Sequence, residues 1–475
     1  MRLALLLLAA CTPVGDGPSD DTAVDDTAVE EVPLEIADLT LEPSAAITLV
    51  ATLRWTTPLE ATGAVEFGPA EGDFELVVDH GDVGTEHEVV VVGMHEATAY
   101  QLRAVSTTAG GQEVRSEPVT FTTGTVPDPW RPLVLDAYDP ARTQPGWTLF
   151  NVATGYSTRT LVVMVDLDGE PVWYFDDGDG GRSDVVPELV DGRRVLIGPG
   201  VPSGSHPIAV DLAGEVLWTG PQQDLGFTDG GFHHVFHELQ DGTHMLVEYT
   251  SDSLGYMGDT IQVFDDDLNI VWDWCTFDHL ADHPAWVHTN AVFLDEPGGL
   301  LYANSYQMGQ TYKIHRESGD VLWTFGEGGD FAPDPWEVEP FPYHAHAFQI
   351  LPDGHVLMYD NGSSERGWSR VVEYALDEDS MTSEIVWQYP GRLAWDPWWA
   401  AAWGDVERLE NGNTLINASA GTNTPAETVS RLFEVTPEGD TVWQAWLYQG
   451  LGLELGAYAV SRVPAIARPI AGEGR

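Results

Sequence analysis

The sequence has very little positive charge. It carries 20 lysines and arginines against 76 aspartates and glutamates in 475 residues, and Lys313 is its single lysine. Nucleic-acid-binding proteins need a basic surface to pair with phosphates, so the formal net charge of -56 argues against that class of partner. A site for an anionic substrate would have to be local and built from a few aimed donors, because the overall field repels anions.

Cysteines and long apolar runs are also scarce. Leu3–Ala10 is far too short to cross a bilayer, but it follows Arg2 and ends at Cys11, as in a secretion signal. Leu8–Cys11 resembles a bacterial lipobox, which implies acylation of Cys11 and export to the periplasmic face of the outer membrane or the cell surface. A plain secretory signal is the alternative. If Cys11 is lipidated, Cys275 has no partner and no disulfide framework is possible.

The N-terminal quarter divides into three parts. We expect residues 1–11 to be a lipoprotein signal peptide and residues 12–32, rich in Asp, Pro, Gly and Thr, to be an acidic disordered tether. Residues 33–125 alternate apolar and polar side chains with a period of two, which predicts a β-sandwich. Its segment from 87 to 104 resembles part of a fibronectin type III domain, which implies that Tyr100 pins a corner and Trp55 lies in the core. We expect a spacer or docking domain without chemistry.

Residues 126–475 contain a repeat. Half of each repeat is a short apolar run that ends in tryptophan, and the other half is a hairpin whose turn carries Asp-Gly or Asn-Gly. The six tryptophans are Trp173, Trp218, Trp272, Trp323, Trp387 and Trp443. Their spacing of roughly fifty residues is the length of one four-stranded propeller blade. The sequence therefore predicts an all-β protein, with a six-bladed β-propeller after the sandwich and a closing strand between Tyr458 and Pro464.

Histidines recur at one place in this repeat. His234 lies eight residues before Gly242 and His346 eight before Gly354, while His288 begins the corresponding element of the blade between them. Propeller symmetry would gather the three imidazoles near the axis. They could bind zinc as an open three-histidine site, or one could be a nucleophile while the others donate hydrogen bonds to an anion. For a lone histidine, a strand cap or a core hydrogen bond is the simpler interpretation.

Several motifs resemble the bacterial arylsulfotransferase family over roughly residues 146–464. They are Gly146–Phe150, Trp272–Trp274 with Asp278–Leu280, Trp286–Asn290, Tyr312–Ile314 before Gly319–Trp323, the segment from His346 through Asp353-Gly354 to Asp360–Gly362, Ser369–Tyr374 and Arg408–Leu415. In that family a histidine takes the sulfuryl group of an aryl sulfate as sulfohistidine and passes it to a phenol, without a nucleotide sulfate donor or a metal. The resemblance implies that His346 is the nucleophile, supported by His234, His288 and Asn290.

The sequence departs from the family pattern at two positions. Tyr306 stands where the family has an arginine, and Ala347 follows His346 where the family often has an acid. Arginine would give the sulfuryl oxygens a fixed positive fork, whereas tyrosine offers one neutral donor. Either another residue, such as Arg366 or His344, reaches into the site instead, or the activity is reduced or changed.

Two other function classes stay open beside the sulfotransferase that the resemblance implies. One is a catalytically silent surface propeller that acts as a binding or scaffold module, and the other is a metal-dependent hydrolase that uses the three histidines. Calcium is a weaker possibility: the segment from Asp176 to Gly181 is similar to a calcium loop, but it lacks the terminal Glu of an EF-hand, and a solvated hairpin turn is favoured.

Overall fold

The computed structural model describes residues 32–128, 130–154, 160–176, 178, 185–199, 206–221, 231–280, 286–390, 398–418, 428–448 and 455–470. The expected signal peptide with Cys11, and almost all of the expected tether, lie outside the described residues, as does most of the calcium-like loop. Within them the chain is all-β apart from one helical turn, α1 (Thr276–His279). None of the described residues forms a helix with the length and hydropathy needed to cross a membrane.

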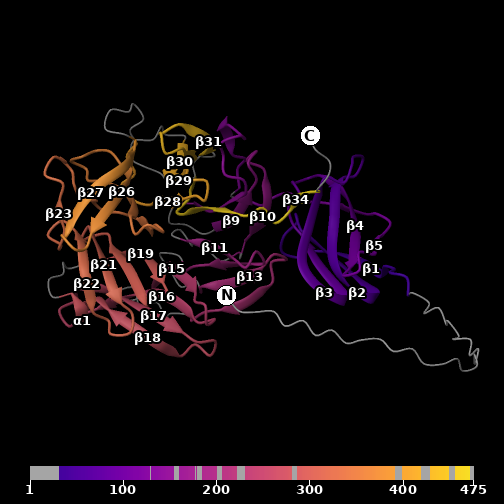
Figure 1. Cartoon of the computed structure of the whole chain (residues 1–475), viewed down its shortest axis with the longest axis horizontal. Coiled ribbons are helices and arrows are strands. Elements are labelled where there is room, and N and C mark those ends of the chain that lie inside the picture. Colours follow the sequence, from indigo (N-terminus) through magenta and orange to yellow (C-terminus); the bar gives the residue numbers. More distant parts are fainter. Residues whose placement is uncertain are drawn as a thin grey trace, which may run out of the picture.

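The N-terminal part folds as one continuous seven-stranded sheet in the order β34-β3-β2-β4-β5, with β1 on β2 and β6 on β4 (Figure 1). Its strands are β1 (Ala37–Pro43), β2 (Ala51–Pro69), β3 (Leu76–Val91), β4 (Ala99–Thr108), β5 (Glu113–Arg115), β6 (Val119–Thr122) and β34 (Arg468–Pro469). The pairing of β2 with β3 shifts register near Thr56 and again near Thr62, and such irregularities let a long strand bend.

Two residue-level expectations for this part are confirmed. The hydroxyl oxygen of Tyr100 accepts the backbone N–H of His95 at 2.9 Å, which pins the corner that leads into β4. Trp55 is only 2% exposed, and its indole N–H donates to Ser106 Oγ at 2.8 Å. A buried indole needs such a partner, because an unpaired N–H would cost free energy in the core.

The rest of the chain forms the predicted six-bladed propeller, because the strands from β7 to β33 fall into six sheets (Figure 1). The first blade contains β8 (Trp147–Thr154), β9 (Thr160–Val165) and β10 (Pro171–Phe175), the second β11 (Pro187–Val190), β12 (Arg194–Ile197), β13 (Ile208–Asp211) and β14 (Val216–Thr219), and the third β15 (Phe232–Glu238), β16 (His244–Ser251), β17 (Met257–Phe264) and β18 (Ile270–Cys275). The fourth blade contains β19 (Thr289–Asp295), β20 (Leu300–Ser305), β21 (Gln310–His315) and β22 (Val321–Gly326), and the fifth β24 (Ala347–Ile350), β25 (Val356–Asp360), β26 (Arg370–Asp377) and β27 (Thr382–Tyr389), with β23 (Ala332–Pro333) on its edge. The sixth blade contains β28 (Asp405–Arg408), β29 (Thr414–Ala418), β30 (Thr428–Val435) and β31 (Thr441–Tyr448), with β7 (Val134–Tyr138) on its edge.

The repeated tryptophans fasten neighbouring blades to one another, as predicted. Trp173 of the first blade donates its indole N–H to the carbonyl of Leu212 in the second, at 3.0 Å. Trp443 of the sixth blade donates to Leu167 of the first, at 2.9 Å. Equivalent bonds run from Trp272 to Arg316 and from Trp387 to Pro437. Each of these four indoles thus reaches the neighbouring sheet and satisfies a carbonyl there.

The end of the described chain closes the ring. β32 (Leu455–Gly456) and β33 (Val460–Val463) pair with β8, so the first blade takes its innermost strands from the C-terminal end, as the sequence predicted. The chain then leaves the propeller, and β34 pairs with β3 of the N-terminal sheet.

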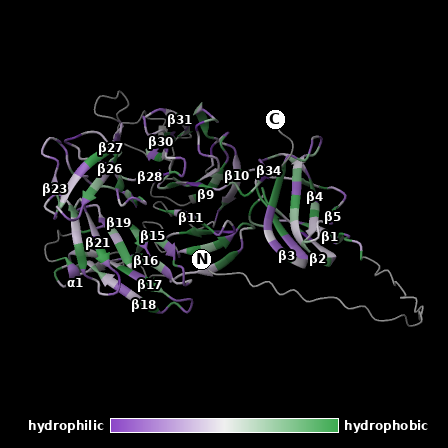
Figure 2. Cartoon of the chain, in the orientation of Figure 1, coloured by the Kyte–Doolittle hydropathy of each residue, from purple (hydrophilic) through white to green (hydrophobic). Residues whose placement is uncertain are grey.

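The N-terminal sheet and the propeller share a hydrophobic core. Ile47 and Val91 belong to the same buried cluster as Trp147 and Val172 of the first blade. Hydrophobic segments lie along the strands of both parts (Figure 2). The backbone N–H of Thr48 also donates to the hydroxyl of Tyr174 at 3.0 Å. The N-terminal part therefore packs against the first blade through an apolar interface.

Candidate active site

Three successive blades carry a histidine with an unusual backbone conformation at or just before the innermost strand. His234, His288 and His344 have φ angles of 59°, 57° and 56°, in the left-handed region that non-glycine residues rarely adopt. In the sixth blade Trp403, two residues before β28, has a φ of 62°. Such strained turns cluster at functional sites, where the surrounding structure holds them for a purpose. Here the repeated turn brings one imidazole after another to the same end of the axis.

The first group of imidazoles comes from the third and fourth blades. His234 Nε2 lies 3.3 Å from His288 Nε2, so one proton can lie between the two rings. His288 Nδ1 is 2.9 Å from the hydroxyl of Tyr249, and burial holds the pKa of His288 well below its ordinary value. His233 stacks on Tyr249 and donates from Nε2 to Asp259 at 3.1 Å. At neutral pH His288 is therefore a neutral imidazole with both nitrogens engaged.

His346 stands beside this group with a fixed tautomer. Its Nδ1 is 2.9 Å from Asn361 Oδ1, and the Asn361 amide nitrogen donates to the carbonyls of Ala400 and Trp403 at 2.8 Å each. Because both amide hydrogens are used, the oxygen must face His346, which must then carry its proton on Nδ1. Burial lowers the pKa of His346 to about 4. Its Nε2 therefore keeps a free lone pair at neutral pH.

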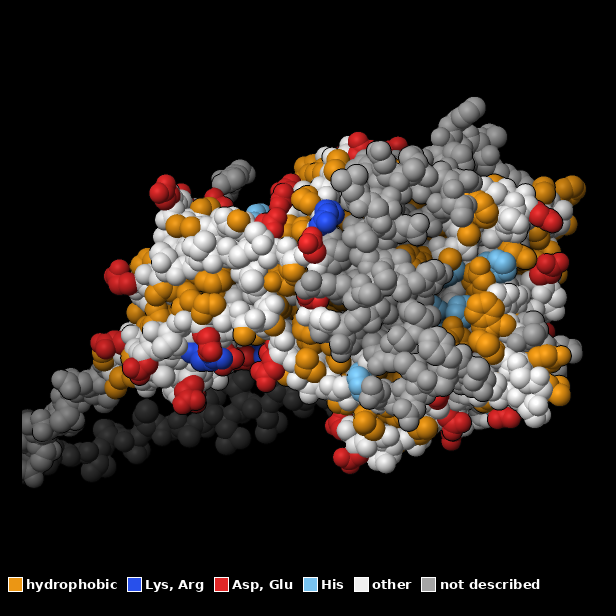
Figure 3. All heavy atoms as spheres, turned by 180° about the vertical axis from the view of Figure 1, so that it is seen from behind, with side chains coloured by type: hydrophobic (Ala, Val, Ile, Leu, Met, Phe, Trp, Pro, Cys, Tyr) orange, Lys and Arg blue, Asp and Glu red, His pale blue; other side chains and the backbone are white. Residues whose placement is uncertain are grey.

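Aromatic rings join the two groups into one site. Tyr306 stacks on His344 with centroids 4.3 Å apart and meets His346 edge-on at 4.9 Å. Tyr458, which begins the closing segment, stacks on His234 at 5.2 Å. Figure 3 shows histidine side chains gathered beside hydrophobic ones on this face of the propeller. The structure thus brings together the predicted residues His234, His288, His344, His346 and Tyr306.

Next to the imidazoles lies a cavity of about 140 Å³ in the channel between the innermost strands. His234, Asn290, His346, Asp405 and Tyr458 line it together with apolar residues. Asn290, another predicted site residue, is buried and donates from its amide nitrogen to the carbonyl of Ala345 at 3.3 Å. Its Oδ1 has no hydrogen-bond partner among the described residues, so it can accept a hydrogen bond from a ligand.

Tyr306, at the family arginine position, and Arg366, expected to reach into the site, are both bonded to other groups of the protein. The hydroxyl of Tyr306 donates to the carbonyl of Ala401 at 3.2 Å, and burial raises its pKa. Arg366 is only 5% exposed and forms a two-pronged pair with Asp360 at 2.7 and 2.9 Å. It borders a separate hollow beside Tyr343. The structure therefore does not bring Arg366 to the imidazoles, and Arg366 shares the carboxylate of Asp360 with Arg370.

Sequence reasoning did not assign roles to Tyr249, Asn361, Asp405 and Tyr458. Asn361 stands in one of the family-like motifs, and Asp405 directly follows the glycine that occupies the histidine position in the sixth blade, so both carried a signal. Tyr249 and Tyr458 carried none, because their closeness to the histidines depends on strand register and ring closure. Burial raises the pKa of Asp405 to about 6.

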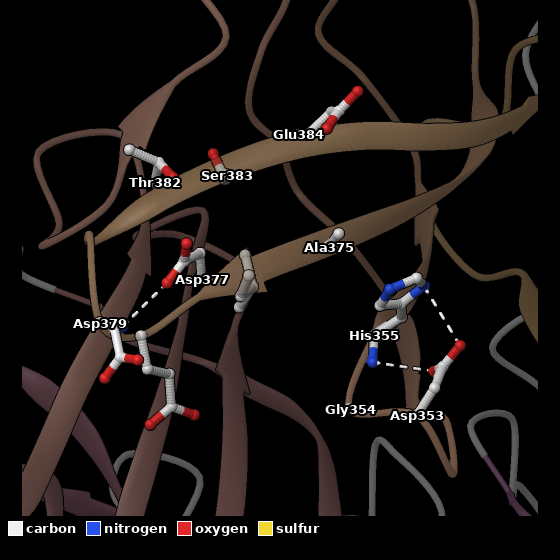
Figure 4. A pocket seen from close by; sticks show the side chains of 11 residues that line it. Asp353, Gly354, His355, Ala375, Asp377, Asp379, Thr382, Ser383 and Glu384 are labelled. Atoms are coloured by element: carbon white, nitrogen blue, oxygen red, sulfur yellow. Dashed lines mark hydrogen bonds and ion pairs between the residues drawn. The ribbon is translucent and has the colours of Figure 1, made fainter.

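Two groups of described side chains could hold a metal ion. One consists of His233, His234 and His288, whose ligand atoms lie within 4.8 Å of one another. The other consists of Asp353, His355 and Glu373 on the surface of the fifth blade. Figure 4 shows Asp353 and His355 of this second group beside an acidic hollow of about 620 Å³, with His355 turned toward Asp353. Its Glu373 is also paired with Arg408 at 2.8 Å.

The fold and the site thus define a six-bladed propeller with several buried imidazoles gathered at one end of its axis, a place where a ligand or substrate can bind. The model of the Arylsulfotransferase (ASST) family matches residues 137–449, from β7 to the end of the sixth blade. The chain therefore belongs to the arylsulfotransferase family, which supports an aryl sulfotransferase activity in general.

Solved structures resemble the chain only distantly. A structural-genomics protein of unknown function from Bacteroides thetaiotaomicron VPI-5482 is 12% identical, with a TM-score of 0.37, over 88% of this chain and 99% of that one. A chain of a nidogen/laminin complex is 12% identical, with a TM-score of 0.39, over 66% and 97%. Sqt1 from Saccharomyces cerevisiae is 11% identical, with a TM-score of 0.34, over 78% and 95%. A search of curated proteins gives no match.

Proposed function

We propose that the protein transfers a sulfuryl group from an aryl sulfate to a phenolic acceptor through a sulfohistidine at His346, without a nucleotide sulfate donor or a metal. The observation that carries the proposal is the Asn361 contact, which fixes the His346 proton on Nδ1 and leaves Nε2 as a lone-pair nucleophile. The low pKa of His346 supports it, since the imidazole stays unprotonated at neutral pH.

The reaction divides into two displacements at sulfur. In the first, His346 Nε2 forms an N–S bond while the S–O bond to the aryl group breaks, and the departing phenolate takes a proton from the His234–His288 pair. In the second, an acceptor phenol returns a proton to that pair as its oxygen attacks sulfur, and the N–S bond breaks. The donors of this pair stabilise the charge that develops on oxygen.

No guanidinium faces the imidazoles among the described residues, so we assign the binding of the sulfuryl oxygens to neutral donors. His344 is half-buried at the mouth, stacked on Tyr306 and in tilted ring contact with Tyr343, and burial lowers its pKa. Its N–H can therefore approach an anion at the mouth. Tyr306 supports His344 and His346 through ring contacts, and the surrounding aromatic rings provide faces on which an aryl group can stack.

The first test is transfer from a chromogenic aryl sulfate to a phenol, with and without chelator. The variants are His346→Ala and, as a control, His355→Ala on the surface of the fifth blade. We expect metal-independent transfer that is lost only in His346→Ala. Incubation with donor alone should add one sulfuryl group to the peptide that contains His346, measured by mass spectrometry. Absence of transfer across a panel of donors would favour a catalytically silent binding or scaffold module.

We also propose how the molecule is held in place. Residues 1–11 act as a lipoprotein signal peptide, the acylated Cys11 anchors the protein to the membrane, and residues 12–32 form the tether. The domain of residues 33–125 is a fibronectin type III-like spacer. Replacement of Cys11 by Ser should release the protein from the membrane fraction into a soluble one, and a Cys11→Ser protein that stays with membranes would overturn this part.

A further inference from the structure

Three imidazoles of the candidate site are arranged as a set of metal ligands. His233, His234 and His288 each offer a nitrogen, and these atoms lie within 4.8 Å of one another. The closest pair, His234 Nε2 and His288 Nε2, is 3.3 Å apart. Two ligands on a tetrahedral zinc ion with Zn–N bonds of about 2.0–2.1 Å are separated by about 3.3–3.4 Å. This pair therefore already has the separation that zinc requires.

The surroundings of the three rings orient them as metal ligands are usually oriented. His233 is fully buried and donates from Nε2 to Asp259, whose other oxygen accepts the backbone N–H of Thr289 at 2.7 Å. His233 Nδ1 has no hydrogen-bond partner among the described residues. His288 is held through Nδ1 by the hydroxyl of Tyr249, so its Nε2 is directed at His234. Carboxylate and hydroxyl partners on the far nitrogen are the usual support of a histidine ligand.

Charge and chemistry select the kind of ion. The ligands are imidazole nitrogens, which suit zinc, copper, nickel and cobalt better than magnesium or calcium. The other side chains in ring contact with the group are Tyr249, Tyr306, Tyr458 and Trp286, which carry no charge at neutral pH. The net charge of -56 raises the concentration of cations around the molecule.

We propose that His233, His234 and His288 bind one divalent transition-metal ion of the zinc class, with a fourth position open toward the mouth of the propeller. The ion uses the Nε2 atoms of His234 and His288, which the proposed sulfuryl transfer also uses. A bound ion therefore inhibits transfer and makes this site a metal-sensitive switch. Metal binding itself does not depend on the transferase activity.

The test is a titration of the chelator-treated full chain with Co²⁺, whose tetrahedral complexes absorb strongly in the visible range. We expect one Co²⁺ per chain, displaced by Zn²⁺ and not by Mg²⁺. The band should be lost in His233→Gln and His288→Gln and kept in His355→Gln, which alters the other candidate group. Asp259→Asn, which keeps the ligands and alters only their support, should weaken binding by about 10–100-fold.

Each variant is first compared with the wild type in the metal-free form by circular dichroism and thermal unfolding. This control excludes misfolding as the cause of a lost cobalt band. Absence of the cobalt band in the wild type would overturn the proposal, and so would a band lost only in His355→Gln. Transfer that does not fall when Zn²⁺ is added to an active enzyme would overturn the inhibitory role. If no variant transfers sulfuryl groups, the cobalt band still decides whether the metal site exists.

Discussion

The side chains of His346 and Asn361, both of the fifth blade, are locked in a single relative orientation beside its interface with the sixth blade. His346 Nδ1 and Asn361 Oδ1 are 2.9 Å apart, and the amide is itself fixed by the carbonyls of Ala400 and Trp403 from the entry loop of the sixth blade. The position of a single proton on His346 therefore depends on the packing of two blades. This coupling makes the proposed nucleophile sensitive to changes that do not touch it.

Replacement of Asn361 by Asp tests this relationship. A carboxylate beside the imidazole should raise the pKa of His346 by about 1 to 3 from its value of about 4. Loss of the unprotonated form then moves the acidic limb of the pH dependence of kcat/KM upward. Asn361→Ala is the matched control, because it removes the hydrogen bond without adding charge. It should lower activity without raising that limb, and an equal shift in both variants would contradict the assignment.

Tyr306 should act through its ring and not through its hydroxyl. The hydroxyl donates to the carbonyl of Ala401, whereas the ring contacts His344 and His346. We therefore expect Tyr306→Phe to change kcat/KM for an aryl sulfate by only a few-fold and to cost about 1 kcal/mol of unfolding free energy. Tyr306→Ala should lose far more activity. A loss of about 100-fold or more in Tyr306→Phe would instead make the hydroxyl a donor to the transition state.

Arg366 should prove to be a stabilising residue. Its guanidinium is buried against Asp360, so Arg366→Met should lower the free energy of unfolding by about 3 kcal/mol. Activity per folded molecule should stay close to that of the wild type, measured as kcat/KM at a temperature well below the unfolding transition. A tenfold rise in KM for the donor at unchanged stability would show that Arg366 binds substrate after all.

The buried carboxyl of Asp405 should make stability depend on pH. Burial raises its pKa to about 6, above the value of about 3.9 in an unfolded chain. The folded state thus binds the proton more tightly, and its advantage is present at about pH 4 and lost as the pH rises through 6. Asp405→Asn, which imitates the protonated form, should match the wild type near pH 4. At pH 8 it should be more stable by about 1 to 3 kcal/mol in urea unfolding. A constant difference across this range would contradict the prediction.

The sequence was sufficient to predict those parts of the fold that are marked by local residue patterns or by a repeat. Asp-Gly turns and the recurrent tryptophans predicted the blades because each blade carries its own turn and its own inter-blade anchor. The histidine positions followed from the same repeat. The course of the N-terminal sheet was not predictable, since the pairing of β2 with β3 shifts register twice and no residue pattern marks these shifts. Nor was the pairing of Arg366 with Asp360, because it depends on how the loop before β26 returns to β25.

The last two strands of the described chain complete two sheets whose other strands come earlier in the sequence. β33 pairs with β8, and β34 pairs with β3, so both sheets wait for residues that leave the ribosome after the whole propeller. Until then the edges of β8 and β3 are bare and open to strands of other molecules. Loss of residues 455–470 to a protease or a premature stop codon would leave both edges exposed together. Both sheets are therefore completed only when residues 455–470 are present and folded.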